Sequence, residues 1–266
     1  FRFILGNLND FDESKMVSFE DQIELDKWII LETSKLQDDV LKLYDSYSYH
    51  NVVQRIHNFC VNELGGIYLD IVKDRLYTCK NSSKARLSCQ TSLNYVLNTM
   101  VRLVAPILSF TSEEIWQTHP SLKEQSESIF LSKYTDNNVK GNCSISSSDW
   151  VRIFEIKDLV NQSIEKLRNE NMLKGSLDSN VIISANIEDK LILDKLGSEL
   201  HFVFISSKAS VVEGDSLSIQ IDQLHDEKCT RCWHRDASVG QSKDHPEICS
   251  RCEVNIGETG ESRSFV

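Results

Sequence analysis

Cys229-Thr230-Arg231-Cys232-Trp233 and Ile248-Cys249-Ser250-Arg251-Cys252 form two C-x2-C pairs that determine how the C-terminal part of this chain folds. Two thiols that are two residues apart on a tight turn can face one cation, and two such pairs complete a tetrahedron of sulfurs, which a structural zinc ion prefers. The gap between the pairs lies in the range of about 15–20 residues that is typical of such sites. The alternatives are two disulfides or four thiols without a ligand. Since four cysteines leave no open coordination position, we expect one structural Zn2+ ion on Cys229, Cys232, Cys249 and Cys252.

The composition bounds the class of protein. The chain has 266 residues, of which 40% are hydrophobic, enough for two or three domains with buried cores. With only 10 Gly and 3 Pro, it should be rich in helix. No apolar run approaches the roughly 18 residues of a membrane span. The formal net charge of -11 opposes binding to nucleic acid, so an RNA partner requires a local basic surface.

The cysteines and the first residues suggest a compartment and an origin. The four cysteines outside the pairs are scattered, which together with the C-x2-C pairs indicates a reducing, cytoplasmic location. The chain opens at Phe1 with no Met and no signal-peptide layout, inside an amphipathic pattern. We therefore expect a fragment of a longer protein.

The first half of the chain carries apolar residues at helical spacing. The pattern predicts helices over residues 20–45, 50–64 and 82–106, with the paired glycines 65–66 interrupting or ending the second. Thr111-Ser112-Glu113-Glu114 has the form of a capping box that opens a short helix. The apolar residues 106–110 are expected to pack under the helices. Together these features predict an antiparallel helical bundle over residues 1–135.

The second half changes character. The polar residues 136–148 are the predicted linker, and a long helix that starts near Trp150 is expected to end at Gly175. Strands are predicted at 181–183, 202–205 and 217–221, with a helix at 188–196. The predicted fold class is mainly α: the bundle, a small α+β unit over residues 148–225, and a zinc-binding module over residues 226–266.

Several stretches resemble one enzyme family. The residues around the two cysteine pairs, Lys228–His234 and His245–Cys252, strongly resemble the C-terminal zinc domain of bacterial isoleucyl-tRNA synthetases, which are class I aminoacyl-tRNA synthetases. Three further stretches resemble the anticodon-binding helical domain of that family in the right order: Phe3–Phe11, Tyr68–Tyr77 and Val104–Trp116. The last two also occur in the valyl enzymes, and the zinc module narrows the resemblance to the isoleucyl type. The family ending is matched by residues 257–265.

The resemblance implies a role in protein biosynthesis. Such ligases attach isoleucine to its tRNA, using ATP and Mg2+ in a catalytic domain with His-x-Gly-His and Lys-Met-Ser-Lys-Ser motifs. Neither motif nor an editing domain is present here, so the chain alone is expected to be inactive and to carry no catalytic residue. The implied partners are isoleucine-specific tRNA and the catalytic and editing domains of the same parent chain, in a monomer without a membrane contact.

Candidate RNA contacts follow from charge and position. Lys73, Arg75, Lys80 and Arg86 belong to a locally basic stretch, whose alternative is a solvated helix face. Arg231 and Trp233 lie on the first cysteine pair, where a guanidinium and an indole could bond or stack on a base of the anticodon loop. The alternative for Trp233 is packing in the core of the module. For Arg231 it is neutralisation of the thiolate charge.

Two other functions compete with the ligase interpretation. Some DNA-repair glycosylases end in a similar four-Cys finger, but they carry a Gly-Arg pair that is absent before Cys249. A zinc ribbon that docks nucleic acid or protein without any link to aminoacylation is the second alternative. His225 and His234 flank the first pair and could replace a cysteine ligand.

Overall fold

A computed structural model describes residues 1–136, 139, 141–257 and 260–266. These residues form two compact units, one made of Phe1–Asp70 with Leu87–Asn142 and the other of Ile71–Arg86 with Cys143–Val266. The segment Ile71–Arg86, which lies inside the predicted helical domain 1–135, is thus part of the second unit. The predicted linker 136–148 and the family ending 257–265 each include residues outside the described ones.

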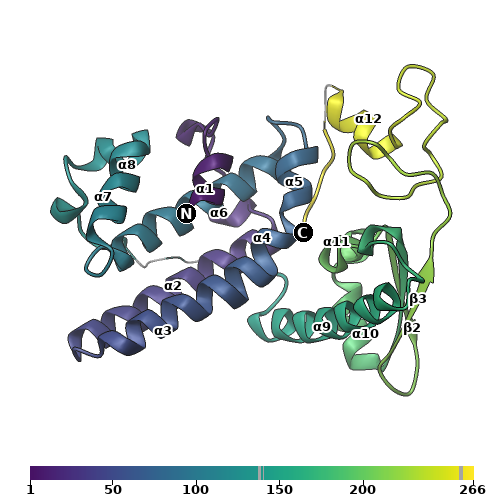
Figure 1. The fold of residues 1–266 in the computed structure, drawn as a ribbon, viewed down its shortest axis with the longest axis horizontal. Helices are drawn as coiled ribbons and strands as arrows, with labels where there is room; N and C mark the ends of the chain where they lie inside the picture. Colours follow the sequence, from purple (N-terminus) through teal and green to yellow (C-terminus); the bar gives the residue numbers. More distant parts are fainter. Residues whose placement is uncertain (137–138, 140, 258–259) are drawn as a thin grey trace. The chain divides into compact units, whose positions relative to one another are not determined.

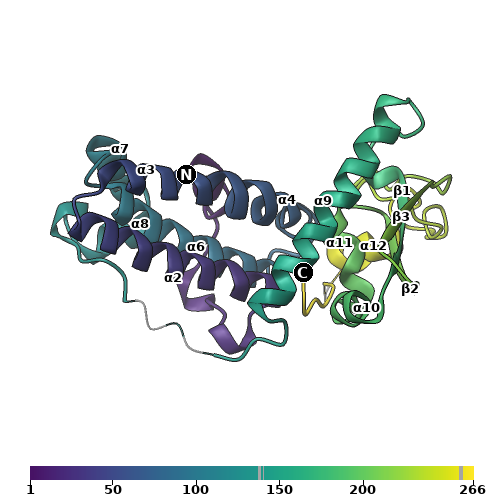
Figure 2. The same ribbon diagram turned by 90° about the horizontal axis from the view of Figure 1, so that it is seen from below.

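The first unit is built from helices (Figures 1 and 2). They are α1 (Arg2–Asn7), α2 (Glu24–Asp45), α3 (Tyr49–Phe59), most of α6 (Lys84–Val104), α7 (Ser109–Thr118) and α8 (Pro120–Gln125). Short 3-10 turns lie at Glu13–Lys15, Phe19–Asp21 and Ile129–Leu131. None of the helices of the described residues, in either unit, combines the length and the apolar character needed to span a bilayer.

Apolar stripes hold this bundle together. Ile23 N donates to Ser88 Oγ at one end of the pair α2 and α6 (3.0 Å), and Tyr44 Oη donates to Leu103 O at the other (2.8 Å). The two helices therefore run parallel, while α3 returns antiparallel to α2 (Figure 2). The predicted stripes form the core, including the fully buried Leu25, Ile29, Leu36, Val40, Leu93, Val96 and Leu97. This part of the predicted fold class is confirmed.

The glycines at 65 and 66 do not end a helix. They lie in a π-helical segment, Cys60–Tyr68, that continues α3. A Cβ atom on Gly65 would lie 2.7 Å from Cys60 O, and one on Gly66 would lie 2.9 Å from Val61 O. The wider π turn brings each glycine against the carbonyl five residues earlier, where a side chain does not fit. Of the two predicted outcomes, the structure shows an interruption of the regular α-helix and not an end.

Two predictions about residues 106–116 are wrong. Helix α7 already begins at Ser109, so the supposed capping box lies inside the helix, and the residue before the helix gives no side-chain cap. Glu113 accepts hydrogen bonds from Ser128 Oγ (2.9 Å) and Ile129 N (3.1 Å), which tie α7 to the following turn. The apolar residues at 106–108 do not pack underneath, and the Phe110 side chain is 93% exposed.

The second unit contains a small sheet covered by helices (Figure 1). The strand order is β2-β1-β3, with the central β1 parallel to β2 and antiparallel to β3. Val181 pairs with Ala209 on one side and with Ile221 on the other. The elements are α5 (Lys73–Thr78), α9 (Ser147–Asn169), β1 (Ser179–Ala185), α10 (Ile187–Asp194), α11 (Leu200–Phe204), β2 (Lys208–Glu213), β3 (Ser218–Gln223) and α12 (Ser250–Ile256), with α4 (Leu69–Ile71) at the boundary and 3-10 turns at Ser176–Asp178 and Gly197–Glu199.

The α+β unit predicted here is confirmed with two corrections. Residues 202–205, predicted as a strand, form α11 and the left-handed Ile205 that ends it (φ 52°). The missing strand is β2, an edge strand with only alternate half-buried residues and hence a weak apolar pattern. Helix α9 ends at Asn169, with Asn171 in the left-handed conformation (φ 57°), so Gly175 does not terminate it.

Candidate metal centre

The first cysteine pair lies on a tight turn. Cys229 N donates to His234 O (2.9 Å), and Trp233 N donates to Cys229 O (3.0 Å). Trp233 closes the turn in the left-handed conformation, with φ 67°. Residues other than glycine rarely adopt this conformation, and it needs support from the surrounding structure. The Trp233 side chain is exposed, whereas the two thiols of the turn are buried.

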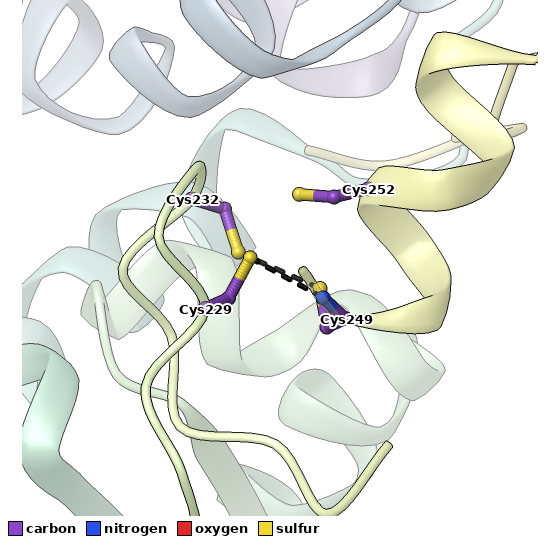
Figure 3. Close-up of side chains that lie close together, drawn as sticks. All are labelled: Cys229, Cys232, Cys249 and Cys252. Carbon is purple, nitrogen blue, oxygen red and sulfur yellow. Dashed lines mark hydrogen bonds between the residues drawn. The ribbon is translucent and has the colours of Figure 1, made fainter. Parts of the chain in front are cut away.

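The second pair belongs to a helix. Cys249 is the N-cap residue of α12, and Cys252 lies in its first turn. Cys249 N donates to the sulfur of Cys229 (3.4 Å), which joins the two pairs. Figure 3 shows the four side chains, two from the turn and two from the start of α12, with their sulfurs facing one another.

The four sulfurs fit one zinc ion. All four thiols are buried, and their sulfur atoms lie within 4.8 Å of one another. The Cys232 and Cys249 sulfurs are 3.7 Å apart. Four sulfurs at about 2.3 Å from a zinc ion would be about 3.8 Å apart in a regular tetrahedron. None of the four forms a disulfide. The geometry fits one structural zinc ion, which Cys229, Cys232, Cys249 and Cys252 would hold.

The pKa values of Cys249 and Cys252 indicate why a cation would stabilise this cluster. Hydrogen bonds from Cys232 and Cys252 lower the pKa of Cys249 to about 4, whereas hydrogen bonds with Cys232 and Cys249 raise the pKa of Cys252. Ionisation of all four thiols at such short distances is therefore unfavourable without a cation. A divalent cation at their centre stabilises the thiolates and removes this conflict. His234, considered above as a ligand, lies outside the cluster, with its Nε2 3.9 Å from a carboxylate oxygen of Asp74.

The predicted basic contacts divide into two kinds. Lys73 is exposed on α5. Arg75 is 1% exposed and donates to Ala85 O (3.1 Å), while Arg86 is 8% exposed and donates to Leu76 O (3.3 Å). These two guanidinium groups are buried and bond the backbone around α5 and the start of α6. That Arg75 and Arg86 contact RNA stays a prediction, which their burial does not favour.

The remaining candidates lie on or near the metal module. Lys80 is half-buried, and its Nζ donates to Gly257 O (2.9 Å). Arg231 is also half-buried and donates to Thr78 O. Trp233 is 61% exposed, so it does not fill the core of the module, where Val239 and Ile248 pack against the cysteines.

The structure adds one residue that the sequence analysis did not single out. Lys228 is exposed, and its Nζ lies 5.7 Å from the centroid of the Trp233 ring. An ammonium group at this distance from an indole makes a cation–π contact. The sequence feature that could have identified Lys228 is its position directly before Cys229, the first cysteine of the cluster.

Comparison with known proteins agrees with this geometry. Residues 26–183 match the family described as the anticodon-binding domain of tRNA ligase, and residues 226–254 match the zinc finger found in FPG and IleRS. The chain is 40% identical to an isoleucine–tRNA ligase of Pectobacterium atrosepticum over 282 residues, covering 100% of this chain and 30% of the relative. It is 40% identical to that of Francisella philomiragia over 279 residues, covering 99% and 30%.

The ligase of Psychromonas ingrahamii is 41% identical over 279 residues, covering 99% of this chain and 29% of the relative. The chain thus spans about 30% of the length of the curated relatives that it matches. The family match extends over more than half of the chain, from the helical unit into the sheet, and the four-Cys site lies where the zinc-finger match lies. The chain therefore belongs to the family of anticodon-binding domains of tRNA ligases.

Proposed function

We propose that this chain is the tRNA-binding part of an isoleucine–tRNA ligase. The similarity to isoleucine–tRNA ligases over 99–100% of the chain supports this proposal. The parent enzyme would attach isoleucine to its tRNA in the cytoplasm as a monomer. ATP, Mg2+, catalysis and editing would belong to other domains of the parent chain. The task of this part is to hold the anticodon region so that the acceptor end reaches the catalytic domain.

The observation that carries the RNA contact is the exposed indole of Trp233 on a turn held by the metal centre. An aromatic ring in this position can stack on an unpaired base of the anticodon loop. Because the turn includes two zinc ligands, the ring is fixed before RNA arrives, which reduces the entropy lost on binding.

Phosphate contacts are proposed for the exposed lysines. Lys228 lies beside the indole, and Lys73 lies on α5, whose Thr78 carbonyl accepts the hydrogen bond of Arg231. Ammonium groups at these positions supply local positive charge in a chain whose formal net charge is -11. We propose that Arg231 and Lys80 support the module through their backbone contacts and take part in RNA binding from there.

The test is binding of the chain to isoleucine-specific tRNA and to a non-cognate tRNA in a filter assay. Trp233→Ala should weaken cognate binding about 5- to 150-fold, which corresponds to the 1–3 kcal/mol of a stacked base. Trp233→Phe should keep most of the affinity because it keeps a ring. Phe110→Ala, which removes an even more exposed ring from the first unit, serves as the control and should have no effect.

Two outcomes would overturn the proposal. Unchanged affinity of Trp233→Ala with zinc still bound would remove the indole from the interface. Equal affinity for both tRNAs would favour the alternative of a zinc ribbon that docks nucleic acid in general.

A further inference from the structure

The carboxylate of Asp74 on α5 accepts hydrogen bonds from two arginines that are distant in sequence. Arg251 pairs with it through both terminal nitrogens, at 2.7 and 2.8 Å. Arg263 Nη2 donates to the same carboxylate (2.5 Å) and to Glu261 (3.0 Å). Two cations and two carboxylates thus neutralise one another in a largely buried cluster. Removing one member leaves a buried charge without its partner, which is strongly destabilising.

An aromatic ring completes the cluster. The guanidinium carbon of Arg263 lies 3.3 Å from the centroid of the Phe202 ring, and that of Arg251 lies 5.1 Å from it. Phe202 is on α11, which packs against α9 and β2. Arg251 and Arg263 are therefore held between the ring and Asp74. Burial opposes ionisation of Asp74, but the hydrogen bond and charge of Arg251 hold the pKa of this carboxyl well below its ordinary value.

The cluster connects α5 to the metal centre itself. Arg231 lies between the ligands Cys229 and Cys232, and Arg251 lies between Cys249 and Cys252. Once zinc fixes the four cysteines, both guanidinium groups extend from fixed backbone. Arg251 bonds Asp74 and Arg231 bonds Thr78 O, so each cysteine pair is attached to α5 by one arginine.

We propose that Asp74 is a positioning residue that fixes the metal module on α5 and thereby sets the direction in which the Trp233 indole is presented to RNA. This role rests on the proposed function, since it concerns the same indole. Asp74 lies outside the metal centre and has no need to touch RNA. Its carboxylate accepts from both arginines at once, whereas the NH2 group of an asparagine would face a guanidinium donor.

The test compares Asp74→Asn and Arg263→Gln with Asp194→Asn, which removes a surface charge that pairs with Lys190 in the same unit. Each full-length variant is loaded with Co2+ to read the thiolate–metal absorption. Each is also labelled with 5-fluorotryptophan, so that the 19F signal of Trp233, assigned by its loss in Trp233→Phe, reports on the indole. Hydrogen exchange of residues 226–256 and cognate tRNA affinity complete the set.

Asp74→Asn and Arg263→Gln should both keep the Co2+ spectrum while shifting the Trp233 signal and raising exchange in residues 226–256. Their tRNA affinity should fall by about tenfold, equal to about 1.4 kcal/mol. Asp194→Asn should change none of these. Metal-loaded variants with an unshifted Trp233 signal and unchanged exchange would overturn the proposal. Loss of metal in both variants would also overturn it, because the cluster would then maintain the metal site.

The outcome for tRNA separates this inference from the proposed function. If Trp233→Ala binds tRNA normally while Asp74→Asn still shifts the indole signal, the RNA contact is refuted and the attachment of the module through Asp74 stands. If Trp233→Ala weakens binding and Asp74→Asn does not, Asp74 has no part in presenting the indole.

Discussion

Removal of the metal should unfold the C-terminal module and leave the helical unit intact. The perturbation is a chelator, or Cys232→Ser, which replaces one of the four buried sulfurs. Cys79→Ser is the matched control because Cys79 is also a buried thiol but bonds Glu261 (3.0 Å) and takes no part in the cluster. The control should keep its metal.

The expected magnitude follows from how little apolar surface the module buries. Two partly buried apolar side chains, Val239 and Ile248, pack against the four buried cysteines of the module. Full burial of two such side chains would contribute about 3–6 kcal/mol. Zinc binding by a four-ligand structural site contributes about 10–16 kcal/mol. Since the metal supplies the larger part, the module without it should lose its fold.

The assay is hydrogen exchange after chelation, with zinc release followed by a colorimetric indicator. Amides of residues 226–256 should lose their protection as zinc is released, while those of α2 and α6 should keep it. Helical circular dichroism should fall only slightly. A metal-free chain whose residues 226–256 keep full protection and resist protease would refute this reasoning.

Three further perturbations have defined outcomes. Gly65→Ala would place a Cβ atom 2.7 Å from Cys60 O, so it should destabilise the first unit by about 1–3 kcal/mol in denaturant titration. Asp189→Asn breaks a bidentate pair with Arg152 (2.7 and 2.8 Å) and should lower stability by about 1 kcal/mol at pH 7. The Arg152 hydrogen bond lowers the pKa of Asp189. Its stabilisation is therefore complete above the unfolded value of about 3.9 and is lost as pH falls below it, so the variant and the parent should converge in acid. Lys73→Ala should reduce the slope of log affinity for tRNA against log salt by about 0.7–0.9 if it contacts one phosphate.

Each of these three substitutions has a control variant and an outcome that would contradict the prediction. Gly6→Ala meets no atom within 4 Å and should be neutral, and equal stability of both glycine variants would contradict the π-helical explanation. A stability difference for Asp189→Asn that persists at pH 2 would contradict the linkage argument. Lys35→Ala removes a surface lysine that pairs with Glu32 in the first unit and should not change the salt slope. An identical slope for Lys73→Ala would exclude a phosphate contact.

Local patterns were enough for the elements whose shape depends on near neighbours. The stripes of α2, α6 and α9 were predictable because apolar residues at helical spacing must share one buried face. The cluster of four cysteines was predictable because each short C-x2-C pair brings its own two thiols together. The central β1 was also predictable, since every second residue along it is buried and the residues between are half-buried.

Sequence patterns gave wrong predictions where contacts with a distant segment decide the secondary structure or the exposure of a residue. The apolar run at 202–204 suits a strand or a helix equally well, and its packing as α11 against α9 and β2 selects the helix. Arg75 and Lys73 look alike in sequence, yet the first is buried and bonds Ala85 O while the second is exposed. Charge alone therefore could not separate a bracing residue from a surface one.

The sequence by itself determined the helical bundle and singled out the four cysteines, because both rest on spacing along the chain. The family followed from the resemblance of whole stretches of sequence. Only the tertiary structure decided which cations are accessible and that Asp74 meets Arg251, 177 positions away. The physical reason is that burial and ion pairing depend on which surfaces meet after folding. The spacing of residues along the chain does not indicate which surfaces will meet.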